Sequence, residues 1–165
     1  MLKRLKEYLD QHKIKYQTIT HSTAYTAQEI AGKAHIPGKD LAKVVMISID
    51  DEVAMAVLPA SHLADLSRIK EVTGAHHVEL THESDYKDLF DESEPGAMAP
   101  FGNLYGLRVF VATALTEDEY IVFNAGTHQE LVRLSYRDYE ALVKPQVFSF
   151  SIKEQRGKSG NIREA

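Results

Sequence analysis

Two side chains in this sequence could take part in chemistry, because each is ionisable and lies at the end of an apolar run. Lys43 opens the run Lys43 to Ile49, so it either faces solvent at a strand end or points into a cavity. At the mouth of a cavity its ammonium group can bind a phosphate or polarise a carbonyl. His128 follows the run Tyr120 to Ala125 in an Ala-Gly-Thr-His turn. It is either a site residue or a loop histidine with local hydrogen bonds.

The segment Pro95-Gly96-Ala97-Met98-Ala99-Pro100-Phe101-Gly102 is predicted to be a shaped loop, which we call the Gly/Pro loop. Glycine and proline do not continue a helix or a central strand, and glycine lets a backbone approach another molecule closely. The loop contains no acid or base. We therefore expect it to form the wall of a small pocket and to present backbone N–H groups, while charged chemistry comes from elsewhere in the chain.

The other histidines indicate less. His21 follows a predicted strand and is a third candidate, and the alternative is a turn residue that helps to cap the next helix. The spacing of His62, His76, His77 and His82 matches no metal-ligand pattern, so we expect no metal site.

Two acidic clusters, Asp50 to Glu52 and Glu117 to Glu119, are each expected at a hairpin turn as solvated charge. The nucleophile elbow of serine hydrolases, the phosphate-binding P-loop and the dinucleotide fingerprint are all absent from the sequence. No cofactor is therefore expected.

The composition narrows the functional class. A chain of 165 residues is long enough for one domain with its own core. Without cysteine, a disulfide framework, a zinc–thiolate site and a cysteine nucleophile are excluded, which fits a reducing cytoplasm. No apolar run approaches the roughly 20 residues of a membrane span, and the start lacks the apolar region of a signal peptide. The net charge of −5 gives no overall basic footprint. Neither DNA nor a membrane is expected as a partner, and any contact with nucleic acid should be local.

Periodicity and capping residues predict the elements that position these groups. Helices are expected over about residues 1–12, from the Thr26 capping box to Pro37, from Ser61 to Thr73, from Thr81 to Phe90, and from Ser135 to Val143. Strands are expected over residues 15–20, 43–49, 53–58, 77–80, 107–112, 120–125 and 131–134. Because hairpins dominate this pairing, the predicted fold class is α+β with a mixed, mostly antiparallel sheet.

The last 22 residues differ from the rest. Residues 144–165 contain five Lys or Arg and two Glu, a net charge of +3, so residues 1–143 carry the remaining −8. Alternation from Phe148 to Ile152 predicts an edge strand, and the chain from Gln155 onward is expected to be disordered. The basic residues are interpreted as solvated charge, with an electrostatic tether for RNA as the alternative. We therefore divide the chain into a domain over residues 1–143 and a basic tail over residues 144–165.

The order of these motifs resembles the YbaK-type aminoacyl-tRNA editing domains, the free-standing relatives of the insertion domain in bacterial prolyl-tRNA synthetases. The resemblance covers about residues 1–143. It rests on a histidine-threonine segment, a helix with Glu29, the strand-opening Lys43, a Gly-x-x-x-Pro-Phe-Gly loop and an Ala-Gly-x-His turn. It implies a mixed, curled sheet flanked by helices in a single domain.

The resemblance also implies a metal-independent deacylase that hydrolyses the ester joining a wrong amino acid to the 3′ end of tRNA. Aminoacyl-tRNA is then the partner, together with a possible aminoacyl-tRNA synthetase. Lys43 and His128 take the catalytic roles. The implied substrate-binding residues are Gly96, Ala97, Met98, Ala99, Pro100, Phe101, Gly102, Gly126, Thr127, His21 and Thr26.

Two departures from the family pattern bear on the substrate. Ala97, Met98 and Ala99 stand where family loops often carry serines, and Ala112-Thr113 stands where a strand often ends in aspartate. The pocket becomes more apolar, and Met98 is a candidate steric block that favours a small group such as alanyl, seryl, threonyl or cysteinyl. The alternatives are a non-catalytic binding module for an amino acid, nucleotide or synthetase, and a metal-dependent hydrolase.

Overall fold

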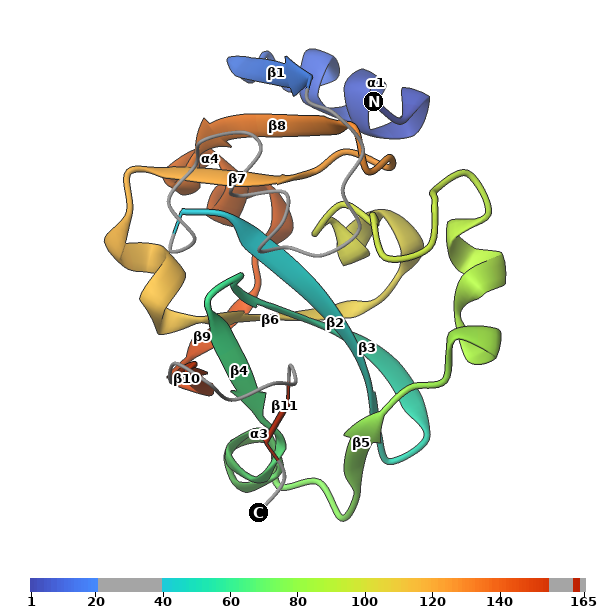
Figure 1. The fold of residues 1–165 in the computed structure, drawn as a ribbon, viewed down its shortest axis with the longest axis vertical. Helices are drawn as coiled ribbons and strands as arrows, with labels where there is room; N and C mark the ends of the chain where they lie inside the picture. The colour runs from blue at the N-terminus through green and yellow to red at the C-terminus, as the bar shows by residue number, and fades with distance from the viewer. Residues whose placement is uncertain (21–39, 155–161, 164–165) are drawn as a thin grey trace.

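The structure, a computed structural model, describes residues 1–20, 40–154 and 162–163 (Figure 1). In this part of the chain the fold is α+β, as the sequence predicts, with helices packed around mixed sheets. The described helices are α1 (Lys3–Gln11), α3 (Leu66–Thr73) and α4 (Tyr136–Val143).

The described strands form three sheets. The largest has five strands in the order β5 (Val78–Leu80), β2 (Ala42–Ile49), β3 (Glu52–Pro59), β6 (Arg108–Ala112) and β9 (Gln146–Phe148). A second has the order β1 (Tyr16–Thr20), β8 (Glu130–Ser135) and β7 (Tyr120–Asn124). The third has the order β10 (Ser151–Lys153), β4 (His62–Asp65) and β11 (Ile162–Arg163).

Most neighbouring strands run antiparallel, and three pairs are parallel: β3 with β6, β6 with β9, and β4 with β11. Figure 1 shows the β1–β8–β7 sheet lying across one end of the larger sheet. The two meet where Leu41 bridges Val122. Because β6 and β7 belong to different sheets, the predicted hairpin turn at Glu117 to Glu119 is wrong. A 3₁₀ turn, Thr113–Glu117, connects these strands instead.

The central strands β2 and β3 are covered on both faces, which divides the core in two. Along β2, Ala42 and Met46 face a cluster that includes α1, α4, β7, β8 and the Gly/Pro loop. The alternate residues Val45 and Ile47 face a second cluster with β4, α3 and Phe150. Since successive strand residues point to opposite faces, this division assigns each β2 side chain to one half of the core.

One predicted helix begins later than expected, and another is wrong. The helix expected from Ser61 begins only at Leu66, because residues 62–65 pair as strand β4, and the Asp65 side chain caps the helix by accepting from Arg68 N. The segment from Thr81 to Phe90 contains two 3₁₀ turns, Glu83–Asp85 and Lys87–Phe90, in place of an α-helix. By contrast, α4 begins at its predicted Ser135 cap and ends at Val143.

The beginning of the basic tail packs on the domain. Strand β9 pairs with β6, and β10 pairs with β4, so the single edge strand predicted over Phe148 to Ile152 is split in two. Phe150 lies between them and is buried in the second core cluster. Residues 162–163 form β11 beside β4, and the remaining residues from 155 onward lie outside the described part of the chain.

Candidate functional site

The Gly/Pro loop is anchored from behind by α4. The Tyr139 hydroxyl, which is fully buried, donates a hydrogen bond of 2.7 Å to the Pro100 carbonyl. Burial raises the pKa of Tyr139, so this hydroxyl keeps its proton. Phe101 packs edge-on against the Tyr139 ring with centroids 5.3 Å apart. The C-terminal half of the loop is therefore fixed to the core, and Gly102 packs toward Val109 of β6.

The other half of the loop is joined to the turn that follows β7. Gly126 N donates to the Ala97 carbonyl at 3.0 Å, and Glu94 N donates to the Gly126 carbonyl at 2.8 Å. Gly126 has φ +101°, and a Cβ there would lie 2.6 Å from Leu2 Cγ. Only glycine fits this position, since a side chain meets both backbone strain and a clash. These contacts bring the Gly/Pro loop and the Ala-Gly-x-His turn into one region of the structure.

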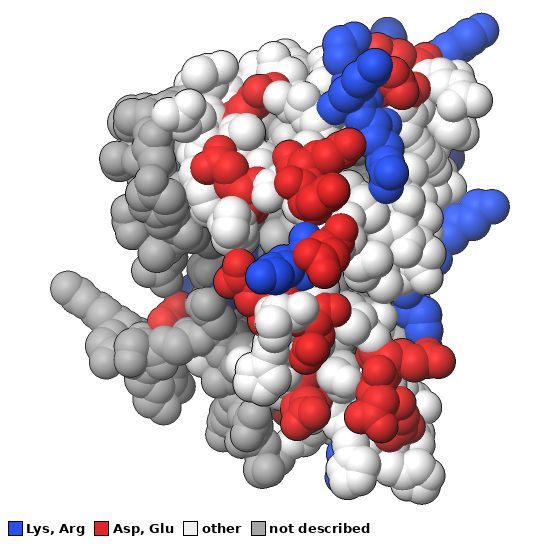
Figure 2. All heavy atoms as spheres, turned by 90° about the vertical axis from the view of Figure 1, so that its right-hand side faces the viewer, with Lys and Arg blue, Asp and Glu red and all other residues white. Residues whose placement is uncertain are grey.

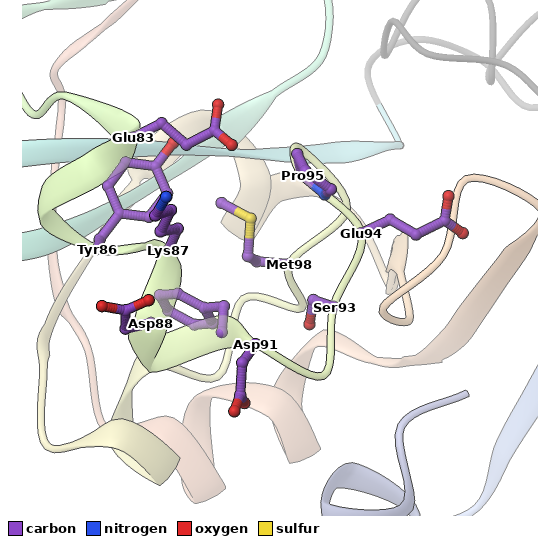
Figure 3. A pocket seen from close by; sticks show the side chains of 10 residues that line it. Glu83, Tyr86, Lys87, Asp88, Asp91, Ser93, Glu94, Pro95 and Met98 are labelled. Atoms are coloured by element: carbon purple, nitrogen blue, oxygen red, sulfur yellow. The ribbon is translucent and has the colours of Figure 1, made fainter.

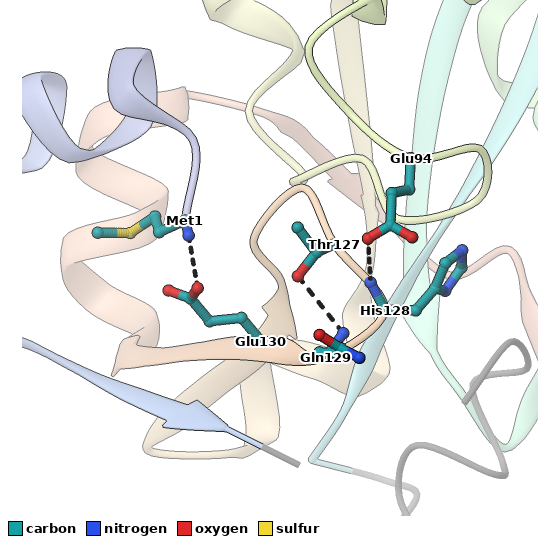
Figure 4. Close-up of polar contacts among 6 residues, drawn as sticks. All are labelled: Met1, Glu94, Thr127, His128, Gln129 and Glu130. Carbon is teal, nitrogen blue, oxygen red and sulfur yellow. Dashed lines mark hydrogen bonds and ion pairs between the residues drawn. The ribbon is translucent and has the colours of Figure 1, made fainter. Parts of the chain in front are cut away.

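His128 lies in this region and is 4% exposed. Its Nε2 is 2.7 Å from the Pro95 carbonyl. A carbonyl only accepts, so Nε2 carries a proton and donates it to this oxygen. The His128 backbone N–H donates to Glu94 Oε1 at 3.3 Å (Figure 4). Glu94 and Pro95 thus fix both the backbone and the ring of His128.

A pocket of about 280 Å³ opens on the outer side of the loop. Its apolar wall includes Met98, Phe90 and Pro95, and its rim carries acidic side chains from residues 83–94 (Figure 3). This segment contains six Asp or Glu and one Lys. Figure 2 shows acidic side chains gathered on the corresponding face of the molecule. Met98 is 6% exposed and so belongs to both the core and the pocket wall.

Lys43 lies on a different face from the inner residues of the loop. It pairs with Leu58, which belongs to the second core cluster, whereas Met98 and Phe101 of the loop belong to the first. The Lys43 side chain therefore lies on the opposite face of β2 from these loop residues. The side chain is partly buried. Desolvation lowers the pKa of Lys43, and the negative charge of Glu154 acts in the opposite direction. The register thus divides the predicted site into a cationic part and a loop part, and a single cleft lined by both stays a prediction.

Some predicted features lie outside the described residues. These are His21, Thr26, Glu29 and the helix expected from Thr26 to Pro37. In the described ranges, no three His, Asp or Glu side chains gather in a way that could hold a metal ion. No helix within them is long and apolar enough to cross a membrane.

Sequence reasoning missed two residues that shape this region. Glu94 accepts from the His128 backbone, and Tyr139 holds the Pro100 carbonyl. Glu94 directly precedes Pro-Gly, which is a signal for a turn but not for a bond to a residue 34 positions later. Tyr139 lies on the apolar face of its helix, where nothing in the sequence distinguishes a hydroxyl donor from an ordinary core ring.

Comparison with known proteins gives a consistent family. The model of the family described as "Aminoacyl-tRNA editing domain" matches residues 21–142. A proline–tRNA ligase of Macrococcus caseolyticus is 23% identical over 72% of this chain and 22% of its own length. One from Staphylococcus epidermidis is 25% identical over 75% of this chain and 23% of its own length. The chain thus spans under a quarter of these curated relatives.

Solved structures show the same fold. The crystal structure of a hypothetical protein superposes with a TM-score of 0.81 at 16% identity, covering 91% of this chain and 100% of that one. Another, described as a candidate trans-editing enzyme for prolyl-tRNA synthetase, has a TM-score of 0.76 at 19% identity and covers 92% of this chain and 96% of that one.

Proposed function

The chain belongs to the aminoacyl-tRNA editing domain family, and we propose that it is a trans-editing deacylase that hydrolyses the ester of a mischarged small amino acid on tRNA. The observation that carries this proposal is the family match over residues 21–142, which includes both Lys43 and the Gly/Pro loop. The substrate is the 3′ end of an aminoacyl-tRNA, and the reaction belongs to translation in the cytoplasm. A synthetase is a further possible partner, in line with the ligase relatives.

The reaction needs little from the protein because an aminoacyl ester is already activated. A water oxygen attacks the carbonyl carbon, the bond to the ribose oxygen breaks, and that oxygen takes a proton. The products are the free amino acid and the deacylated tRNA. The protein must place the water and stabilise the oxyanion, and the vicinal ribose hydroxyl can help to move the proton.

Lys43 is proposed to supply positive charge from the end of β2, where one substrate that passes around the strand end reaches both its ammonium group and the loop. The charge acts on either the terminal phosphate or the ester carbonyl. Its partial burial strengthens such an interaction, since a charge acts more strongly where water is excluded. His128 is proposed to act from the loop side, where the Pro95 carbonyl holds its ring through Nε2. The N–H of Gly126 itself is not an oxyanion donor in this scheme, because it already bonds the Ala97 carbonyl.

The Gly/Pro loop is proposed to select the amino acid by size. Ala97, Met98 and Ala99 offer no hydroxyl groups, and the loop is held at both ends by backbone and side-chain bonds. A held, apolar wall excludes larger side chains by steric contact. Among small side chains it discriminates weakly, because one methylene is worth only about 1–3 kcal/mol.

The test is a panel of mischarged tRNAs mixed with the purified protein, with and without a strong chelator. We expect loss of the ester for small aminoacyl groups, little loss for bulky aromatic ones, and no effect of the chelator. Lys43→Ala should lose most of the activity, because one lost oxyanion-stabilising donor costs about 2.7–4 kcal/mol. Lys15→Ala is the matched control, since Lys15 is exposed. Equal activity of Lys43→Ala and the wild type would remove Lys43 from the mechanism.

A non-catalytic binding module is the second candidate function. It is favoured by the acidic face over residues 83–94, because such a surface repels the polyanionic body of tRNA (Figure 2). The same panel separates the two candidates, since a module for an amino acid, a nucleotide or a synthetase leaves the ester intact.

A further inference from the structure

The segment after α4 contributes to the neighbourhood of Lys43, although it lies beyond the part that matches the family. Strand β10 pairs with β4, placing Ser151 opposite Ala64 and Lys153 opposite His62. The next residue, Glu154, donates its backbone N–H to the Ser61 carbonyl at 2.9 Å. This segment is therefore held along the start of β4.

Three contacts locate Glu154 at the end of the hairpin that carries Lys43. Lys43 pairs with Leu58 near the open end of the β2–β3 hairpin. At that end Ala60 N donates a hydrogen bond of 2.7 Å to the Leu41 carbonyl, which extends the pairing of the two strands. Ser61, which holds Glu154, is the next residue along the chain. The negative charge of Glu154 accordingly acts on the Lys43 ammonium group.

A second polar pair fixes the same segment. His62 Nδ1 lies 2.8 Å from Ser151 Oγ. Burial lowers the pKa of His62, and the positive charges of Lys43 and Lys153 lower it further, while Glu117 raises it. A neutral His62 adds no positive charge next to Lys43. Among the described residues, the charged groups that act around Lys43 and His62 are thus two lysines, Lys43 and Lys153, and two glutamates, Glu117 and Glu154.

We propose that Glu154 is a positioning residue for Lys43. The Glu154 carboxylate holds the Lys43 ammonium group in place, so that segment 146–154 completes the site. This inference rests on the proposed function, in which Lys43 acts on the aminoacyl end. It assigns the beginning of the basic tail a role in the reaction and not only in packing. The predicted boundary after residue 143 would then fall inside the functional unit.

Competitive labelling tests the pair without any substrate. The full chain is acetylated over a range of pH, and the extent of labelling at Lys43 is measured by mass spectrometry. Glu154→Gln keeps the backbone bond to Ser61 and removes only the charge. We expect half-labelling at a lower pH than in the wild type, because desolvation then acts without the opposing carboxylate.

Glu52→Gln is the matched control, since it removes one carboxylate at the other end of the same hairpin, opposite Ile49. It should leave the half-labelling pH of Lys43 unchanged. The same half-labelling pH in Glu154→Gln and the wild type would overturn the inference, as would an equal shift in Glu52→Gln.

The deacylation assay separates this inference from the proposed function. Glu154→Gln should move the alkaline limb of the rate profile to lower pH, and Glu154→Asp should restore part of it. If Lys43→Ala abolishes turnover while Glu154→Gln keeps the wild-type profile, the inference fails and the function stands. If the wild type hydrolyses no mischarged tRNA, the function fails while the labelling result still decides whether Glu154 governs the charge of Lys43.

Discussion

Gly96 lies directly against the imidazole of His128: a Cβ added at position 96 would be 3.5 Å from Cε1 of the ring. Gly96 also has φ +81°, a conformation that favours glycine. The loop and the histidine thus meet at a residue with no side chain. Any group added there occupies space beside the ring.

Gly96→Ala should therefore separate stability from activity. The backbone strain should lower the free energy of unfolding by about 1–2 kcal/mol. Gly106→Ala is the matched control, because Gly106 has φ +71° and nothing within 4 Å of the added Cβ. We expect a similar loss of stability in both variants and a loss of deacylation only in Gly96→Ala. Equal activity in the two would show that the space beside His128 is not used by the substrate.

The hydrogen bond from the Tyr139 hydroxyl to the Pro100 carbonyl predicts that removal of the hydroxyl oxygen lowers the stability of the fold. Tyr139→Phe keeps the ring packing on Phe101 but leaves a buried carbonyl without this donor. The free energy of unfolding in urea should fall by about 1–3 kcal/mol. Tyr120→Phe, at an exposed position, should change it by less than about 0.5 kcal/mol. A Tyr139→Phe protein as stable as the wild type would mean that α4 does not hold the loop.

The close approach of Gly126 to Leu2 predicts that substitutions at these two positions have non-additive effects on stability. Gly126→Ala places a Cβ 2.6 Å from Leu2 Cγ, so overpacking of about 1–3 kcal/mol adds to the backbone strain. In a Leu2→Ala background the clash disappears and only the strain, about 1–2 kcal/mol, remains. Unfolding measurements on the four proteins of the cycle should show this difference.

Gly74→Ala provides the control for that cycle. Gly74 has a similar positive φ, +71°, and nothing within 4 Å of an added Cβ. Its effect should be the same in the wild-type and Leu2→Ala backgrounds. If Gly126→Ala also had the same effect in both backgrounds, the turn would have to move away from Leu2 at no cost in free energy.

Local signals predicted the parts of this fold that local physics decides. The Ser135 cap of α4 and the β2–β3 hairpin are both where the sequence places them, because a cap and a tight turn depend on neighbouring residues. Strand β4 was missed because its partners, β10 and β11, come some 90 residues later or more. The capping signal at Ser61 was then stronger than any visible strand signal.

The face on which Lys43 lies could not be predicted for a related reason. Strand β2 is buried on both faces, so its sequence reads as a continuous apolar run without alternation. Such a run identifies a central strand but does not show which of its residues face which half of the core. The partners that decide it, Leu58 on β3 and Glu154 after β10, belong to the tertiary structure.

The partial burial of Lys43 predicts a stability that depends on pH. Because desolvation lowers the pKa of Lys43 in the folded chain below its ordinary value of 10.5, the unfolded chain binds more protons between those two values. The contribution of Lys43 to stability is therefore most favourable above 10.5 and is lost as the pH falls through the folded pKa. Lys43→Met should be more stable than the wild type at neutral pH, with an advantage that shrinks as the pH rises toward 10.5.

Urea unfolding of Lys43→Met and the wild type at neutral and alkaline pH measures this advantage, and Lys15→Met, at an exposed position, should show no such trend. A constant difference between Lys43→Met and the wild type would mean that the ammonium group is as well solvated in the folded chain as in the unfolded one.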